Sequence, residues 1–425
     1  MKFIISQLKN KLKTVFIPIV TAEVASVSIW IKAGGRFEDL SNMGISHFLE
    51  HLVFRGTRKR TAKQIKQEIE GVGGLINAFT SREYTCYYAK VPKKYISTAI
   101  DLLSDITINP LMKEEDIKKE KKIILEEIRM YKDMPSYYVD DILNEIMWQG
   151  HPLGRPLAGN YSSIANINRR KLVEYKDRLY HSANMVVVIA GNINNRQIRD
   201  IIQDKFAKLS PKKDERKPSR FIYKKHKPRL KHINKMTQQT HMSLGFHTSC
   251  RTHPERYALA VLSVVLGGNM SSRLFQKIRE EEALAYQIST SLAKYYDCGS
   301  FNISAGIKNK KLIKAVSLIL DELEKIKKTG LTEDEFRKAK EFIIGSTLIN
   351  LENSTDRMLW MGAKVISNDP VLRVEEIIRN IRKVKSNEVQ EVADKYLKKD
   401  NLNLSVIGPV KNDIGKIRNI INNFS

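Results

Sequence analysis

The order of predicted elements in the first half of the chain recurs in the second half, and this repeat constrains the fold more than any single segment. A strand-like run followed by a helical pattern at residues 85–106 returns at 300–323. An acidic helical segment beginning at Leu111 returns at Gly330, and the apolar run ANMVVVIAGNI at 183–193 returns as NLNLSVIGPV at 401–410. Such self-similarity predicts two similar domains.

The length of the chain and one basic stretch set the expected domain boundaries. A chain of 425 residues exceeds the usual size of a single hydrophobic core, so two domains are expected. The stretch PKKDERKPSRFIYKKHKPRLKH at 211–232 is rich in basic residues and proline and poor in apolar residues, which is typical of a linker. We therefore expect one domain at residues 1–212, a basic linker at 213–231 and a second domain at 232–425.

The segment GISHFLEHLVFRGT at residues 44–57 is the strongest functional motif. His47 and His51 are four residues apart, so on a helix they share one face, with Glu50 beside them. Catalytic zinc takes three protein ligands, and two neutral imidazoles at this spacing can reach one ion. A carboxylate that is not a ligand, here Glu50, can take a proton from the activated water. The order H-x-x-E-H is typical of the inverzincins; the alternative is a surface helix with two histidines on its polar face.

A third ligand is expected from the acidic helical segment at 113–131. Glu120 and Glu127 are seven residues apart and share one helical face. Glu126 points about 100° away from Glu127, so only one of that adjacent pair can face the site easily, and the spacing does not choose between them. In the second half, the residues aligned with Glu120 and Glu127 are Ala339 and Ser346, and an apolar run replaces the histidine motif. The first half alone is therefore expected to bind the metal.

The formal charge of +26 brings a nucleic-acid-binding protein into consideration, because a dense basic patch collects phosphate groups. The lysines are, however, spread along most of the chain and interleaved with acidic residues, as in KEEDIKKEKK at 113–122. No recognisable nucleic-acid motif accompanies them. Solvated helix faces explain the charge better, and we expect no nucleic acid among the partners.

The N-terminus and the cysteines indicate the compartment. Lysines interrupt the apolar patches of the first 20 residues, so neither a signal peptide nor a membrane span is expected. Cys86, Cys250 and Cys298 are odd in number and widely spaced, which argues against a disulfide framework or a thiolate zinc site. We expect each cysteine to be buried and inert, and the protein to be cytoplasmic, with no membrane partner.

These motifs resemble those of the M16 metallopeptidases, the pitrilysin and insulinase group that includes the mitochondrial processing peptidases and their bacterial relatives. The resemblance covers nearly the whole chain and is closest in residues 44–57 and in EGVGGLINAFTSREYTCYY at 70–88. It implies Glu127 as the third ligand and Glu120 as a supporting residue. It also implies that Asn77 contacts the substrate backbone, and that Ala78 and Phe79 belong to an edge strand to which a peptide adds.

In the second half, LGGNMSSRLFQKIREEEALAY at 266–286 resembles the glycine-rich loop of the family. The resemblance implies that Arg279 and Tyr286 complete the site, where a guanidinium and a phenol would stabilise the oxyanion of the scissile carbonyl. The chain departs from the family at Ala283 and Lys11, where relatives commonly have glycine. Neither position touches the expected chemistry.

The resemblance implies an α+β fold of two similar domains, each a mostly antiparallel sheet packed with helices, that close around a chamber. It implies a zinc endopeptidase with one Zn²⁺ per chain, held by His47, His51 and Glu127, that cuts unfolded peptides or flexible presequences. A homodimer, or a heterodimer with a related subunit, is expected. The alternative is a non-catalytic or partner-dependent subunit of a heteromeric complex, although such subunits usually lack the base or a ligand.

Overall fold

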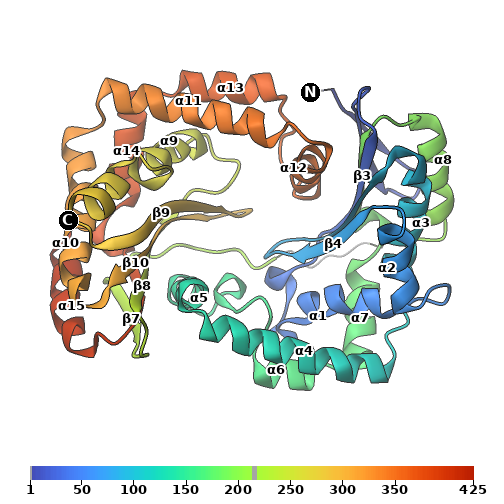
Figure 1. Ribbon diagram of the computed structural model, residues 1–425, viewed down its shortest axis with the longest axis horizontal. Helices are drawn as coiled ribbons and strands as arrows, with labels where there is room; N and C mark the ends of the chain where they lie inside the picture. Colours follow the sequence, from blue (N-terminus) through green and yellow to red (C-terminus); the bar gives the residue numbers. More distant parts are fainter. Residues whose placement is uncertain (1, 213–217) are drawn as a thin grey trace. The chain divides into compact units, whose positions relative to one another are not determined.

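The computed structural model describes residues 2–212 and 218–425, which divide into two compact units. The first unit contains Met1–Arg129, Arg155–Ser219 and Leu348–Arg373, and the second contains Met130–Gly154, Arg220–Thr347 and Val374–Ser425. Figure 1 labels the longer helices and several strands of both units. Residues 213–217, which begin the expected linker, lie outside the described residues.

The first unit is built on a mixed sheet with the strand order β1-β2-β6-β3-β5-β4. Strands β2 and β6 run parallel, with Val15 opposite Val188, and the other neighbours are antiparallel. Strands β2 and β3 follow each other in the sequence but are not paired, because β6 lies between them. The strands are β1 (Ile4–Gln7), β2 (Lys13–Pro18), β3 (Val24–Ile31), β4 (Leu75–Thr80), β5 (Thr85–Pro92) and β6 (Met185–Gly191).

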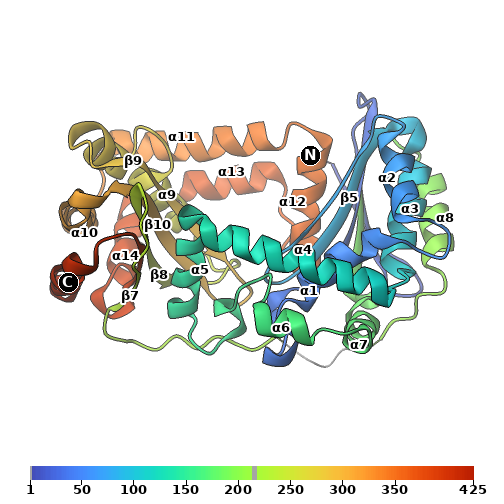
Figure 2. The same ribbon diagram turned by 60° about the horizontal axis from the view of Figure 1, so that its bottom comes forward.

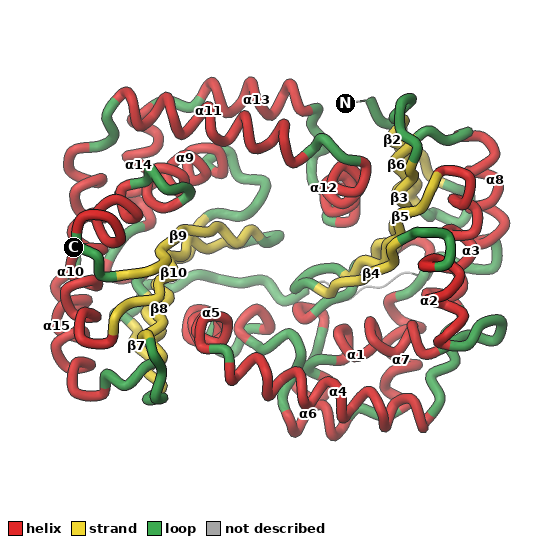
Figure 3. Tube along the Cα trace, viewed as in Figure 1, coloured by secondary structure: helices red, strands yellow, loops and turns green. Residues whose placement is uncertain are grey.

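Helices cover both faces of this sheet, since both faces are apolar. One face carries alternate residues such as Val27, Ile29 and Val187 into the larger core, and the other face carries Trp30 and Val188 against a single helix, α12. Figure 3 shows α12 on one side of the strands and α3 and α8 on the other. The helices of the first unit are α1 (Ile45–Leu52), α2 (Ala62–Glu70), α3 (Ile96–Ile108), α4 (Glu114–Asp133), α6 (Tyr161–Asn166), α7 (Arg169–Leu179), α8 (Asn195–Phe206) and α12 (Ser354–Ile366).

The second unit repeats this plan. Its sheet has the order β7-β11-β8-β10-β9, in which β7 and β11 run parallel and the other neighbours run antiparallel. That pattern matches β2-β6-β3-β5-β4 strand for strand, which confirms the two similar, mostly antiparallel domains expected from the sequence. The strands are β7 (Arg229–Ile233), β8 (Gln239–Thr248), β9 (Ala285–Lys294), β10 (Gly299–Lys308) and β11 (Asn403–Ile407).

The second sheet also has one face on a multi-helix core and one face against a single helix. Residues such as Phe246 and Ile303 enter the main core, while Ile407 on the other face packs with Val139 and Ile142 of α5. The helices are α5 (Pro135–Met147), α9 (Arg256–Gly267), a π-helix η7 (Phe275–Glu281), α10 (Leu312–Thr329), α11 (Glu333–Asn350), α13 (Val374–Lys383), α14 (Ser386–Tyr396) and α15 (Ile414–Asn423).

The two repeats exchange one helix each. Helix α5 follows α4 in the first repeat but belongs to the second unit, and α12 follows α11 in the second repeat but belongs to the first unit. The compact units are therefore discontinuous along the chain. The expected domains, residues 1–212 and 232–425, follow the two repeats of the sequence and stay a prediction. The packed units have other boundaries.

Three smaller observations complete the fold. Cys86 and Cys298 are buried as expected, but Cys250 is half-buried, because it lies in the turn that follows β8. Lys11 and Ala283, the two departures from the family pattern, adopt left-handed backbone conformations with φ of 68° and 49°. Among the described residues, no helix is long and apolar enough to cross a bilayer.

Candidate metal centre

The histidine motif lies on helix α1, and the contacts at the N-terminus of this helix fix where it begins. Gly44 precedes the helix with φ of 90°, and a Cβ there would lie 2.7 Å from the Ala158 carbonyl oxygen, so only glycine fits. The carboxylate of Glu38 accepts hydrogen bonds from the backbone N–H of Gly44 at 2.7 Å and of Ser46 at 2.9 Å. A carboxylate is favourable at a helix N-terminus. The buried face of α1, which includes Phe48 and Leu49, then fixes the rotation of the helix.

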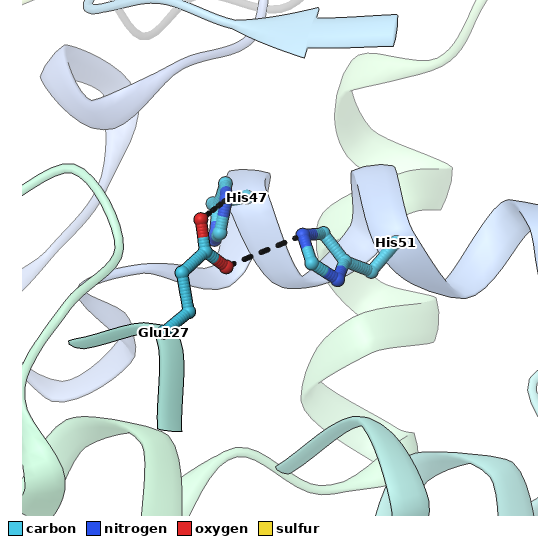
Figure 4. A group of neighbouring side chains, drawn as sticks. All are labelled: His47, His51 and Glu127. Carbon is cyan, nitrogen blue, oxygen red and sulfur yellow. Dashed lines mark ion pairs between the residues drawn. The ribbon is translucent and has the colours of Figure 1, made fainter. Parts of the chain in front are cut away.

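The opposite face of α1 meets α4. His47 Nε2 lies 3.7 Å from Glu127 Oε1, and His51 Nε2 lies 3.6 Å from Glu127 Oε2, as Figure 4 shows. One donor atom from each of the three residues lies within 4.8 Å of the other two. In Figure 2, α4 runs alongside α1. The sequence motif at 44–57 and the acidic helix therefore supply one group that could hold a metal ion.

Glu126 points away from this group. Its side chain is 66% exposed and forms an ion pair with Arg129 at 3.0 Å, one turn along the same helix. Glu127 faces both histidines instead. The geometry thus favours Glu127 over Glu126 as a third ligand, a choice that the sequence spacing left open.

The pKa values of the two histidines shift in opposite directions because their surroundings differ. Burial, and then the neighbouring His51, lower the pKa of His47 to about 3, so this imidazole is neutral at pH 7. Burial also lowers the pKa of His51, but the hydrogen bond with Glu120 and the nearby carboxylates outweigh it, and the net pKa is raised. His47 Nδ1 is buried and has no hydrogen-bond partner within the described part of the chain.

Glu120 supports the group from behind. Its Oε2 lies 3.2 Å from His51 Nδ1, and its Oε1 accepts a hydrogen bond from Arg55 Nε. Because a carboxylate only accepts, Nδ1 of His51 carries the proton and Nε2 faces Glu127. Glu120 is almost fully buried. Two imidazole nitrogens and a carboxylate oxygen form a donor set that fits zinc, with a carboxylate behind one histidine.

Glu50 is held by a residue that the sequence motifs did not single out. Thr80 Oγ1, at the end of β4, donates a hydrogen bond of 2.5 Å to Glu50 Oε2. Burial raises the pKa of Glu50, although Thr80 and His51 oppose the shift. The alternation of strand residues gave a signal for Thr80, because it places Thr80 on the same face as Ile76 and Ala78, which pack on the core that contains α1. No sequence signal pointed to Arg55.

The expected substrate-binding residues lie on β4, which is the last strand in the order of its sheet. Asn77 is exposed, and its Oδ1 accepts a hydrogen bond of 2.8 Å from the backbone N–H of Ala78. Phe79 packs edge to face on Trp30 at 5.7 Å, on the sheet face opposite Ala78. These three residues therefore share an edge strand but not a face. A role for each in substrate binding stays a prediction.

Arg279 and Tyr286 belong to the second unit. Arg279 lies in the π-helix, and its guanidinium carbon is 4.6 Å from the ring centroid of Phe275 and 5.5 Å from that of Tyr286. Tyr286 lies at the start of β9 and is 74% exposed. π-Helices are rare and occur frequently at functional sites. The two residues are close to each other, and their role toward a substrate carbonyl stays a prediction.

The fold and the donor group define a two-domain α+β protein with an inverted two-histidine motif, and comparison with known proteins gives its family. A family model described as insulinase, peptidase family M16, matches residues 14–160, and one described as peptidase M16 inactive domain matches residues 166–343. The chain belongs to the M16 peptidase family.

Similar proteins cover nearly the whole chain. An uncharacterized zinc protease of Streptomyces coelicolor is 35% identical over 91% of this chain and 85% of its own length. The uncharacterized zinc protease YmxG of Bacillus subtilis is 34% identical over 92% of this chain and 95% of its own length. The crystal structure of a protease from Helicobacter pylori superposes with a TM-score of 0.90 at 25% identity, over 96% of this chain and 99% of that one.

Proposed function

We propose that this protein is a zinc-dependent endopeptidase that hydrolyses unfolded peptides or flexible presequences. The observation that carries the proposal is the group of three donors, His47, His51 and Glu127, whose ligand atoms lie within 4.8 Å of one another beside the carboxylate of Glu50. Membership of the M16 family and the zinc proteases among its relatives support the choice of metal and of reaction.

The proposed mechanism gives each residue one task. When bound, zinc would polarise the scissile carbonyl and lower the pKa of water. His47, His51 and Glu127 would hold the ion, and Glu120 would orient His51 through its hydrogen bond. Glu50 would accept a proton from the attacking water and deliver it to the leaving amine. Arg279 and Tyr286 would stabilise the negative charge on the carbonyl oxygen.

The edge strand supports a peptide substrate without a fixed sequence. A peptide that adds to β4 would be held by main-chain hydrogen bonds, which do not depend on its side chains. Such binding needs an extended segment, so unfolded chains and flexible presequences would be cut and folded domains would not. Enclosure in a chamber, assembly as a homodimer or heterodimer, and a cytoplasmic location stay predictions.

Metal analysis and one substitution test the proposal. The purified protein should contain about one zinc per chain and should cut an unstructured peptide. Glu50→Gln should keep the zinc and lose nearly all turnover, because the amide cannot accept the proton, whereas Glu126→Gln should behave like the parent as a matched control. Cleavage by Glu50→Gln at the parent rate would contradict the assigned base. A zinc-loaded chain that cuts only after a related subunit is added would favour the partner-dependent alternative.

A further inference from the structure

A hollow of about 860 Å³ lies in the second unit. None of the residues that line it belongs to the candidate metal centre. Three short segments and Ser425 line it: the chain that leads into β7, the end of α10, and the end of α14 with the loop that follows. Its volume falls within the range of small-molecule sites, roughly 300–1,000 Å³. Each of the three segments contributes two lysines, which are Lys225, Lys227, Lys327, Lys328, Lys398 and Lys399.

The lining is more basic than the rest of this basic chain. Six of its twelve residues are lysine, whereas lysine and arginine together account for 73 of the 425 residues of the protein. Three acidic residues, Glu324, Asp394 and Asp400, line the hollow beside the six lysines. The hollow therefore has an excess of positive charge that the general composition does not explain.

The carboxylates neutralise only part of this charge. Lys225 pairs with Asp400 at 3.0 Å, and Lys327 pairs with Glu324 at 3.2 Å. Lys327 also donates to the backbone oxygens of Ser425 at 2.8 Å and Leu397 at 3.2 Å. Within the described residues, Lys227, Lys328, Lys398 and Lys399 have no ion pair, and all four are exposed. Like charges held close together repel each other, so a bound anion would relieve a cost that the folded unit otherwise carries.

One buried polar atom in the wall also lacks a partner. His226 Nε2 is shielded from solvent and has no hydrogen-bond partner in the described part of the chain, while Nδ1 lies 2.9 Å from the Lys227 carbonyl oxygen. Because that carbonyl accepts, Nε2 is left as an acceptor. A phosphate oxygen also accepts, so the lysines and not His226 would hold an anion in this hollow.

We propose that this hollow binds a compact polyphosphate anion, such as the triphosphate of a nucleotide or inorganic tripolyphosphate. Lysine ammonium groups bind phosphate as point charges, and here they converge on one hollow from three segments. An extended nucleic acid would instead call for a basic stripe along a face or a helix. The site is independent of the proposed peptidase activity.

Calorimetric titration of the full-length protein with sodium tripolyphosphate tests the proposal. The variant Lys398→Gln/Lys399→Gln should bind at least tenfold more weakly than the parent. The matched control, Lys310→Gln/Lys311→Gln, changes another adjacent, exposed lysine pair of the same unit and should bind within twofold of the parent. Glu50→Gln should bind like the parent. Absence of binding by the parent, or equal weakening in both lysine pairs, would overturn the proposal.

Two further measurements control for misfolding of the variant and distinguish a nucleotide from free polyphosphate. If Lys398→Gln/Lys399→Gln melts at a lower temperature than the control, Lys227→Gln/Lys328→Gln, which changes two other segments, should show the same tenfold loss. Parallel titrations with ATP and with a single-stranded oligonucleotide distinguish the ligands. Tighter ATP binding than tripolyphosphate binding would assign a nucleotide, and equal binding would assign the phosphates alone. An oligonucleotide that binds more tightly than both, with the same loss in the variant, would overturn the compact-anion proposal.

Discussion

At the scale of single residues, the carboxylate of Glu50 depends on a neighbouring strand as well as on its own helix. Thr80 donates a 2.5 Å hydrogen bond to Glu50 Oε2 and approaches Thr85 Oγ1 at 3.4 Å. A hydroxyl that donates to a carboxylate fixes the rotamer of that carboxylate and stabilises its charged form. Thr80 is therefore a positioning residue for the proposed base.

Replacing Thr80 tests this role. Thr80→Val keeps the β-branched shape but removes the donor, and a hydrogen bond to a charged group contributes about 1.5–3 kcal/mol, so kcat should fall about tenfold to a hundredfold. KM and zinc content should stay close to those of the parent. Thr80→Ser should recover most of the activity, because it keeps the hydroxyl. A Thr80→Val enzyme with parent kcat, measured on the same unstructured peptide, would remove Thr80 from the mechanism.

Two other residues carry backbone strain. Lys11 and Ala283 have positive φ values of 68° and 49°, and both side chains are exposed. The left-handed conformation costs a residue with a Cβ roughly 1–2 kcal/mol, and glycine avoids most of that cost while losing more entropy on folding.

Lys11→Gly and Ala283→Gly should therefore each raise the free energy of unfolding by about 0.5–1 kcal/mol. Urea titration followed by circular dichroism measures the change. Lys9→Gly provides the control, because Lys9 has no positive φ and glycine there should be neutral or destabilising. A lower midpoint for Lys11→Gly than for the parent would show that the side chain matters more than the backbone conformation.

The sequence predicted those site residues that lie together on one helix. The spacing of His47, Glu50 and His51 places all three on one turn, and the structure brings them together as expected. Glu126 and Glu127 could not be separated without the family resemblance, because their orientation depends on which face of α4 meets α1. Strand alternation indicated the face on which Thr80 lies, but its contact with Glu50, like that of Arg55 with Glu120, joins two elements and depends on how they pack.

At the scale of elements, close glycine contacts set how the single helices lie on the sheets. A Cβ on Gly362 of α12 would lie 2.1 Å from Trp30 Nε1 of β3. In the second unit the roles are reversed, since a Cβ on Gly245 of β8 would lie 2.6 Å from the sulfur of Met147 in α5. Each exchanged helix is thus packed so closely at a glycine that a Cβ there would force its neighbours to move.

Gly362→Ala should lower the free energy of unfolding by roughly 1–3 kcal/mol, because the added methyl group overpacks the contact with Trp30. Gly345→Ala is the matched control in α11, where a Cβ would meet nothing within 4 Å. That variant should be stabilised by up to about 1 kcal/mol through helix propensity. Thermal melting of both variants checks the pair, and equal shifts of the same sign would contradict the packing argument.

Individual helices and strands were easier to predict from the sequence than the elements against which they pack. The helical segment at 113–131 and the apolar run at 183–193, both recognised in the sequence, form α4 and β6 in the structure. Hydrophobic periodicity says that a helix buries one face but not which sheet receives it. The sequence therefore could not predict the exchange of α5 and α12 or the position of β6 between β2 and β3.

At the scale of the whole molecule, the exchanged helices make each unit depend on distant chain segments. Met358, Met361 and Val365 of α12 fill the core on one face of the first sheet, together with Trp30 and Val188. A fragment that ends in the linker would leave that apolar face in contact with water.

We expect residues 1–219 alone to aggregate or to bind a hydrophobic dye, and to lack a cooperative thermal transition. Fusing residues 348–373 to that fragment through a flexible linker should restore a cooperative transition, because the fusion supplies α12. Calorimetry of the two fragments at equal concentration gives the comparison. A fragment of residues 1–219 that melts cooperatively without the added helix would contradict the dependence.

The exchange also bears on how a protein of this kind can change over time. A duplicated gene usually frees one copy to decay, and here the second copy has Ala339 and Ser346 where the first has Glu120 and Glu127. Deletion of that copy would nevertheless remove α12 and uncover the sheet that carries β4. The second repeat is therefore needed for the fold of the first, although it lacks the residues for binding a metal.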